Sequence, residues 1–184
     1  MNKDLINSFK GIIVIDEAYI DFSSQQSFVS CIDKYPNVIV TQTFSKAFGL
    51  AGIRLGICYA NPKIIDVFNK IKPPYNISEL TQKKALERLQ NIDVVKKEVQ
   101  TIMEQREFLI KELKTITCID RVFASDANFI LARVDDANLR YKQLIDNGIV
   151  VRNRTTQPLC ENCLRFTIGT KTENLKLISI LKSF

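Results

Sequence analysis

The 184-residue sequence contains no histidine. Ser-His and Cys-His nucleophiles are therefore excluded, because both need an imidazole to take the proton from the attacking group. No apolar run approaches the roughly 20 residues that a membrane-spanning helix needs, and the amino-terminal residues lack the apolar core of a signal peptide. We therefore expect a cytoplasmic protein with no membrane partner.

Cysteine is also scarce. The five cysteines are an odd number and are widely dispersed, which does not fit a secreted disulfide framework. Only Cys160 and Cys163 form a CxxC pair, and neither a histidine nor a second pair supplies the other two ligands that structural zinc needs. The residues after the pair predict a strand, not the helix that follows a thioredoxin-like motif. We expect reduced thiols and no metal site.

The composition indicates a globular chain. Hydrophobic residues make up 46% of the sequence, and a chain of this length can bury one ordinary core or two small ones. The net charge of +6 raises the question of a nucleic-acid partner. However, Lys and Arg are scattered among acidic residues and no aromatic and basic platform appears, so a solvated surface without nucleic acid is expected.

The segment Thr41–Gly56, TQTFSKAFGLAGIRLG, is the most informative part of the chain. An apolar run leads into it, so Lys46 lies just past the end of a predicted buried strand. A second apolar strand begins at Leu55, and the connection is too short for a parallel crossover. An antiparallel return would place Arg54 beside Ser45 and Lys46. This edge is therefore predicted to bind an anion.

Two glycines and a second strand complete this prediction. Gly49 and Gly52 lie in the connection and supply backbone freedom for a tight turn. Upstream, the run GIIVIDEAYIDF predicts a buried strand that ends at Asp16, with Tyr19 following closely. Ligands bind outside the carboxyl ends of strands in open α/β sheets, so Asp16 and Lys46 face one crevice if their strands run parallel.

These motifs carry a family resemblance. The segments IDEAYIDF and TFSKAFGLAGIRLG, followed by PYN, ANFILAR, VVRN and CLRFTIGT, resemble the fold-type I pyridoxal-phosphate aminotransferases and, among them, the histidinol-phosphate aminotransferases. The resemblance covers nearly the whole chain. It implies an α/β fold: part of the large domain, with a mainly parallel sheet and one antiparallel strand, followed by a small α+β carboxyl-terminal domain.

The resemblance also implies the residues that bind pyridoxal 5'-phosphate. Lys46 would bind the cofactor covalently, Asp16 would pair with the pyridine nitrogen, and Tyr19 would contact the ring hydroxyl. Ser45 and Arg54 would hold the phosphate. The implied cofactor-binding set is Asp16, Tyr19, Thr43, Ser45, Lys46 and Arg54, with Lys46, Asp16 and Tyr19 as the catalytic residues.

Two arginines punctuate apolar strands near the end of the chain. Arg152 and Arg165 lie among Leu, Phe and Ile and need anionic partners. An internal carboxylate such as Glu161 could serve either one. The resemblance instead implies that Arg165, with Arg152 as a second candidate, binds the anionic group of a substrate. A guanidinium suits both the carboxylate of glutamate and the phosphate of an amino alcohol phosphate.

The elements between these motifs predict three parts: 1–76 as the remainder of the cofactor-binding large domain, 77–114 as connecting helices, and 115–184 as the small domain. The first ten residues are expected to be a polar lead-in. A strand is predicted over Ile149–Arg152, and a terminal helix over Glu173–Leu181, capped by Thr172.

The expected function is transamination between glutamate or 2-oxoglutarate and histidinol phosphate or imidazole-acetol phosphate in histidine biosynthesis. Alternatives are an aromatic aminotransferase, a threonine-phosphate decarboxylase, or a catalytically silent dimerising or binding fragment. The resemblance implies a homodimer for the complete enzyme. It also implies a long upstream segment that completes the cofactor site, so this chain is expected to be inactive alone, with unpaired sheet edges.

Overall fold

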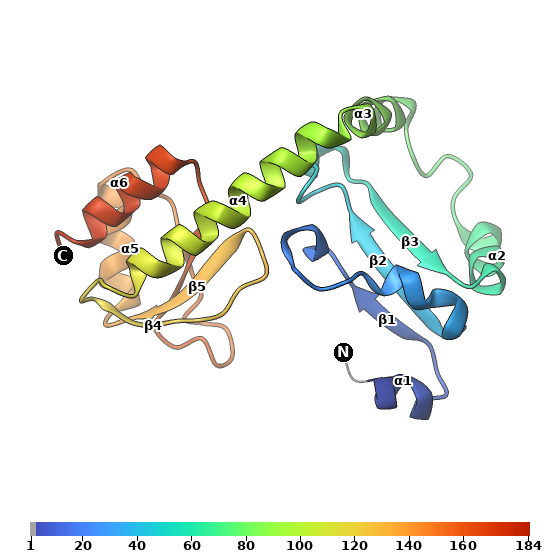
Figure 1. The fold of residues 1–184 in the computed structure, drawn as a ribbon, viewed down its shortest axis with the longest axis horizontal. Helices are drawn as coiled ribbons and strands as arrows, with labels where there is room; N and C mark the ends of the chain where they lie inside the picture. The colour runs from blue at the N-terminus through green and yellow to red at the C-terminus, as the bar shows by residue number, and fades with distance from the viewer. Residues whose placement is uncertain (1–2) are drawn as a thin grey trace. The chain divides into compact units, whose positions relative to one another are not determined.

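The chain divides into two compact units, residues 1–96 and 97–184, and the computed structural model describes residues 3–184. Each unit has its own sheet (Figure 1). The assignment of 1–76, 77–114 and 115–184 to the domains of a complete enzyme stays a prediction. The helices and strands of the first unit are α1 (Lys3–Ser8), β1 (Ile13–Asp16), η1 (Ile20–Phe22), η2 (Phe28–Lys34), β2 (Val38–Thr43), η3 (Ala51–Ile53), β3 (Gly56–Ala60), α2 (Pro62–Ile71) and α3 (Glu79–Gln90).

The sheet of the first unit has the order β1-β2-β3. β1 runs parallel to β2, with Asp16 opposite Thr41, and β3 runs antiparallel to β2, with Gly56 opposite Thr43. Both the parallel pair and the antiparallel return predicted from the sequence are therefore confirmed. The apolar run at the start of β2 is buried, which fixes this strand at the centre of the sheet.

The expectation of a polar lead-in over the first ten residues is wrong for Lys3–Ser8, which forms α1. Ile6 on this helix is buried in a small cluster with Tyr35, Val38 and Val40. Burial of this apolar side chain offsets part of the entropy that the short helix loses on folding. Residues 1–2 lie outside the described residues.

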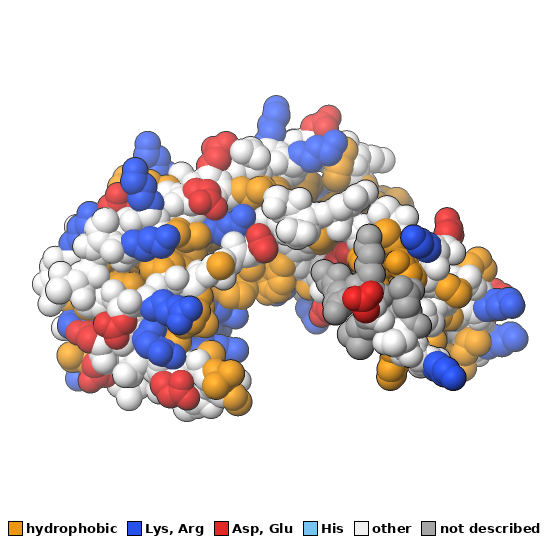
Figure 2. All heavy atoms as spheres, turned by 60° about the horizontal axis from the view of Figure 1, so that its bottom comes forward, with side chains coloured by type: hydrophobic (Ala, Val, Ile, Leu, Met, Phe, Trp, Pro, Cys, Tyr) orange, Lys and Arg blue, Asp and Glu red, His pale blue; other side chains and the backbone are white. Residues whose placement is uncertain are grey.

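The first unit leaves much apolar surface exposed. β1 is an edge strand that pairs with β2 alone among the described residues, and Val14 on it is 60% exposed. An apolar groove of about 510 Å³ lies elsewhere in this unit, and its lining includes Phe44, Leu55 and Leu86. Tyr75 at its rim is 96% exposed. Apolar side chains reach the surface in Figure 2 as well. Large patches of this kind mark interaction sites, ligand-binding grooves or surfaces prone to aggregation.

The second unit contains an antiparallel sheet of order β4-β5-β7-β6. One side of β5 and β7 is buried in a core with α4, α5 and α6, because apolar residues alternate along both strands. α4 begins in the first unit and ends in the second. The elements are α4 (Ile92–Leu113), β4 (Ile119–Val122), β5 (Phe129–Val134), α5 (Ala137–Asp146), β6 (Arg152–Asn153), β7 (Cys163–Thr167) and α6 (Lys171–Leu181).

Two predicted boundaries in this unit are wrong. The predicted strand over Ile149–Arg152 is reduced to β6, because the Ile149 N–H donates to the Leu144 carbonyl at the end of α5 and so continues the helix end. The terminal helix begins two residues earlier than predicted. Its N-cap is Thr170, whose hydroxyl accepts from the Glu173 N–H while the Glu173 carboxylate accepts from the Thr170 N–H, which together form a capping box.

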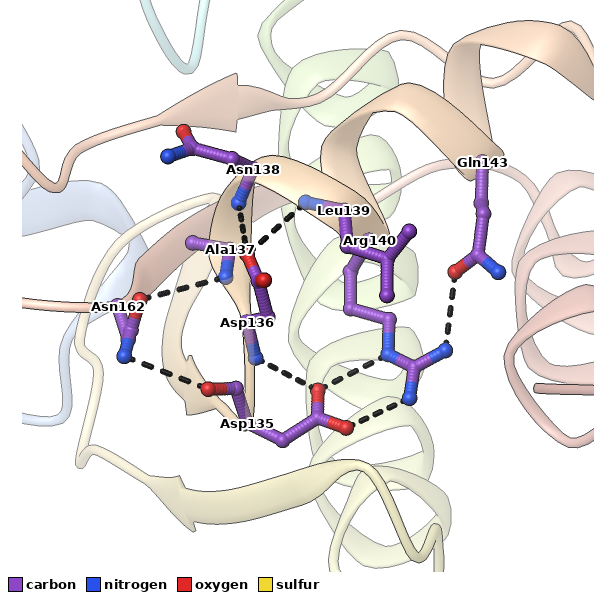
Figure 3. Close-up of polar contacts among 8 residues, drawn as sticks. All are labelled: Asp135, Asp136, Ala137, Asn138, Leu139, Arg140, Gln143 and Asn162. Carbon is purple, nitrogen blue, oxygen red and sulfur yellow. Dashed lines mark hydrogen bonds and ion pairs between the residues drawn. The ribbon is translucent and has the colours of Figure 1, made fainter.

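A network of polar side chains ties the start of α5 to the sheet (Figure 3). The Asp136 carboxylate accepts from the N–H groups of Asn138 and Leu139, as expected of an N-cap. The Arg140 guanidinium donates to both oxygens of Asp135, with distances of 2.9 and 2.6 Å. Arg140 is mostly buried, so this bidentate contact holds the pKa of Asp135 below its ordinary value, and the N–H of Asp136 adds to the effect.

We expect Asp135→Asn to destabilise the second unit in a pH-dependent way. The lowered pKa means that the carboxylate stabilises the folded state above the ordinary value of 3.8, and that this stabilisation is lost as the pH falls through the lowered value. The loss is about 1 kcal/mol or less, because a surface pair is screened by water, and the Asp135 side chain is 45% exposed.

Urea unfolding followed by circular dichroism checks this prediction. The difference between the parent and the variant should be present near pH 6 and vanish near about pH 2. Glu161→Gln is the matched control, because Glu161 approaches Arg133 only at 3.8 Å and is more exposed. A difference for Asp135→Asn that stays constant over this range would contradict the role of the charge.

No helix within residues 3–184 is both long and apolar enough to cross a membrane. On the face seen in Figure 2, Lys and Arg side chains are interspersed with Asp, Glu and apolar side chains. Within the described part of the chain, no group of three or more Cys, Asp or Glu residues gathers in a way that could hold a metal ion.

Candidate active site

The carboxyl ends of β1 and β2 meet at one edge of the first unit's sheet. Because the strands are parallel, Asp16 at the end of β1 lies beside Thr41, and the pairing continues as the Glu17 N–H donates to the Thr41 carbonyl. Asp16 is exposed, and its carboxylate accepts a hydrogen bond from the Ala18 N–H at 3.0 Å. This is the edge at which an open α/β sheet binds its ligands.

Lys46 and Tyr19 come together at this edge. The Lys46 Nζ lies 5.3 Å from the centroid of the Tyr19 ring, and both residues are half-buried. Tyr19 comes from the segment after β1 and Lys46 from the segment after β2, so the parallel pairing is what brings them into contact. Lys46 makes no ion pair with any described residue. Its amine is therefore held over an aromatic ring without an anionic partner.

The connection from β2 to β3 brings the residues that precede Ser45 and follow Arg54 into contact. The Phe44 N–H donates to the Leu55 carbonyl at 3.1 Å, which extends the antiparallel pairing by one step beyond the strands. The Thr43 hydroxyl accepts from the Ser45 N–H and lies 3.3 Å from the Leu55 carbonyl, to which it donates. Thr43 therefore braces the connection, and its direct contact with a cofactor stays a prediction.

Arg54 has a backbone conformation that the sequence did not indicate. Its φ is 55°, in the left-handed region that few residues other than glycine adopt. Gly49 has a φ of 69° and needs to be glycine, as predicted, but Gly52 has no positive φ and open space around it. The strain is thus placed on Arg54 rather than on Gly52. Backbone strain of this kind gathers at functional sites.

Glu17 links the segment after β1 to neighbouring elements through hydrogen bonds. Its carboxylate is buried and accepts three hydrogen bonds, from the Ser27 hydroxyl at 2.7 Å, the Phe28 N–H at 2.6 Å and the Gln42 side-chain amide at 3.0 Å. These contacts join the segment after β1 to η2 and to β2. Burial also raises the pKa of nearby Asp21, and the Glu17 charge adds to that rise. Glu17 therefore holds the segment that connects Asp16 to Tyr19.

The charged residues at this edge fit a ligand that has both an anionic group and a protonated ring nitrogen. Asp16, Lys46 and Arg54 form no ion pair with one another or with other residues in 3–184. The Arg54 guanidinium donates only to the backbone carbonyl of Ala51, at 3.0 Å. An acid, an amine and a guanidinium without ionic partners match the pyridine nitrogen, aldehyde and phosphate of pyridoxal 5'-phosphate.

The second unit brings Arg152 and Arg165 together. They are direct partners across the antiparallel β6–β7 pair, so both side chains leave the same face of the sheet. Two like charges in that position repel each other unless an anion lies between them. Neither arginine has an ion-pair partner among the residues that the structure describes. This pairing was not visible in the sequence, because it depends on the strand register.

Arg165 is positioned by an aromatic ring. Its guanidinium carbon lies 4.9 Å from the centroid of the Phe129 ring on β5, and its buried Nε has no hydrogen-bond partner in the described residues. The alternative in which Glu161 satisfies either arginine is wrong, since Glu161 pairs with Arg133 instead, at 3.8 Å. Arg165 therefore keeps donors free for a ligand.

Residues 3–181 match the family described as aminotransferase class I and II. The chain belongs to this family. A protein from Flavobacterium johnsoniae named histidinol-phosphate aminotransferase is 63% identical to this chain over 178 residues. The matched residues are 97% of this chain and 51% of that protein. The chain thus spans about half the length of the curated relatives it matches.

Solved aminotransferase structures share the fold. The histidinol-phosphate aminotransferase from Clostridium acetobutylicum has a TM-score of 0.89 and 29% identity, over 98% of this chain and 56% of that one. The enzyme from Sinorhizobium meliloti, solved in complex with pyridoxal-5'-phosphate, has a TM-score of 0.81 and 26% identity, over 94% of this chain and 48% of that one. The predicted α/β aminotransferase fold and family are confirmed.

Proposed function

We propose that this chain is the lysine-bearing half of a pyridoxal-phosphate-dependent aminotransferase that moves an amino group between glutamate and imidazole-acetol phosphate. The observation that carries the proposal is the amine of Lys46, which lies over Tyr19 without an ionic partner, at the sheet edge that also holds Asp16. The 63% identical relative named histidinol-phosphate aminotransferase supports the choice of substrate. The complete protein is proposed to be a cytoplasmic homodimer with small-molecule substrates.

Pyridoxal 5'-phosphate supplies an electron sink for the carbanion that forms when the substrate's α-carbon loses its proton. Lys46 would bind the cofactor covalently, and its amine would move the proton at the substrate's α-carbon. The Asp16 carboxylate would keep a proton on the pyridine nitrogen, because a nearby negative charge favours the protonated form. The Tyr19 hydroxyl would donate to the ring oxygen.

The phosphate would be held by Ser45 and Arg54, which flank the Phe44–Leu55 contact of the β2–β3 connection. A guanidinium can donate two parallel hydrogen bonds to a phosphate, which fixes both its position and its orientation. Fixing the phosphate determines how the rest of the cofactor lies relative to Lys46. Thr43, which braces this connection, would act here through Ser45.

The alternative functions differ in the substrate that the complete protein would use. An aromatic aminotransferase or a threonine-phosphate decarboxylase would use the same cofactor residues. The test uses a completed protein, in which this chain is joined to the half of the Flavobacterium johnsoniae relative that it does not match. We expect transfer from histidinol phosphate to 2-oxoglutarate with the highest kcat/KM. Faster transfer from phenylalanine, or release of carbon dioxide from threonine phosphate, would overturn the assignment.

We expect Arg165→Ala in the completed protein to raise the KM for histidinol phosphate and for glutamate. The loss of a charged hydrogen bond to an anion corresponds to about a 10- to 100-fold weaker interaction. Cofactor binding should be unchanged, because Arg165 lies outside the proposed cofactor set. Steady-state kinetics with both substrates and a cofactor titration check this.

Two further variants sharpen the test of Arg165. Arg165→Lys keeps the charge but loses the planar donor pair, so its KM should fall between those of the parent and the alanine variant. Arg133→Ala is the matched control, because Arg133 lies on the neighbouring strand and is bound to Glu161. An unchanged KM for Arg165→Ala would contradict a role in substrate binding.

A further inference from the structure

The CxxC pair of the second unit lies in a hydrogen-bonded turn. The Cys163 N–H donates to the Cys160 carbonyl at 3.0 Å, and Asn162 between them has a φ of 52°. Among the four residues of a β-turn, a positive φ at the third position alone indicates a type II turn. Glycine is preferred at that position, and asparagine is the next choice. The ends of such a turn lie less than about 7 Å apart, close to the span of about 4.4 to 6.8 Å between the Cα atoms of a disulfide.

Contacts with the neighbouring strand and helix hold this turn in place. The Asn162 side chain accepts from the Ala137 N–H at 3.4 Å and donates to the Asp135 carbonyl at 3.3 Å (Figure 3). Its backbone carbonyl accepts from the Val134 N–H at 2.8 Å. The turn is therefore ordered before any bond joins the two sulfurs.

The two thiols differ in access. Cys160 is partly exposed, whereas Cys163 is buried at the start of β7. Burial raises the pKa of the Cys163 thiol, and the nearby Arg133 guanidinium offsets part of that rise. Arg133 also donates from its Nε to the Glu161 carbonyl inside the turn, at 3.1 Å. An oxidant in solution therefore reaches the partly exposed Cys160 thiol first. The Cys163 thiol is buried near the positive charge of Arg133.

We propose that Cys160 and Cys163 form a thiol–disulfide site that hydrogen peroxide oxidises. The Cys160 thiolate attacks one peroxide oxygen, the O–O bond breaks, and the leaving hydroxide takes a proton to become water. The sulfur of Cys163 then attacks the sulfenic acid on Cys160 and displaces its hydroxide, which takes the Cys163 proton as a second water. Two thiols lose two electrons, and the peroxide gains them.

Mass spectrometry of the full chain tests this proposal. The reduced protein is treated with hydrogen peroxide, free thiols are blocked with iodoacetamide, and trypsin then cuts after Arg154 and Arg165. The resulting peptide contains both cysteines and no other. We expect it to be unalkylated and about 2 Da lighter than its reduced form. Cys31 and Cys58, which are also partly exposed, should remain alkylated and serve as internal controls.

Two variants distinguish a specific Cys160–Cys163 disulfide site from oxidation of exposed thiols in general. Cys163→Ser should leave Cys160 as a sulfenic acid that dimedone traps, because nothing is left to resolve it. Asn162→Gly keeps the positive φ but removes the two side-chain contacts of the turn, so its disulfide should form more slowly. The proposal is overturned if parent Cys160 accumulates as a dimedone adduct while Cys163 stays alkylated, or if Cys31 and Cys58 oxidise as fast as the pair.

Discussion

Replacing Lys46 with alanine is expected to abolish covalent cofactor binding and to lower turnover of the completed protein by roughly a thousandfold or more, because the variant loses both the nucleophilic amine and the base at the substrate's α-carbon. The reason lies in the geometry: Lys46 extends over the Tyr19 ring at the edge that holds Asp16 and makes no ion pair in the described residues.

Borohydride reduction in saturating pyridoxal phosphate locates the modified lysine. Trypsin normally cuts after Lys46, so modification there should join the two neighbouring peptides into one that spans residues 35–54. Lys34→Ala is the matched control, since Lys34 also lies over a tyrosine ring, at 5.8 Å from the centroid of Tyr35, but precedes the start of β2 rather than following its carboxyl end. If the cofactor is attached to another lysine while Lys46 stays free, the assignment is wrong.

The strand framework of the first unit was predictable from local pattern. Four apolar residues that end at Asp16, and a second run that leads to Lys46, identify two buried strands, and the short connection before Leu55 requires an antiparallel return. The same pattern therefore predicted that Asp16 and Lys46 share one edge. The prediction depended on the two strands running parallel, which their register confirms.

Features that depend on register or on distant contacts were not predictable. The direct pairing of Arg152 with Arg165 follows from how β6 and β7 align, and the contact of Arg165 with Phe129 comes from a third strand. A period-2 pattern shows which face a residue occupies but not its partner across the sheet. The positive φ of Arg54 was likewise not predictable from the sequence, because the nearby glycines are the residues expected to adopt a positive φ.

This chain by itself is expected to turn over substrate at least about a thousandfold more slowly than the completed protein, because in the proposed enzyme the other half would supply groups that position the cofactor. The chain spans about half the length of the curated relatives it matches. The first unit also exposes apolar surface. Val14 on edge strand β1 is 60% exposed, and the apolar groove beside Leu86 is uncovered. Exposed edges and patches of this kind also favour self-association.

The comparison that decides this uses three proteins in saturating pyridoxal phosphate: the chain alone, the completed protein, and the completed protein with Lys46→Ala. Transamination is measured with glutamate and imidazole-acetol phosphate, and light scattering reports the size of each species. We expect the chain alone to be close to the Lys46→Ala protein in rate and to form larger assemblies than the completed protein. Lys46 and Asp16 already share an edge in the chain alone, so a slow reaction of the amine with the aldehyde is compatible with this expectation. Turnover by the chain alone comparable to that of the completed protein would refute it, since residues 1–184 would then position the cofactor by themselves.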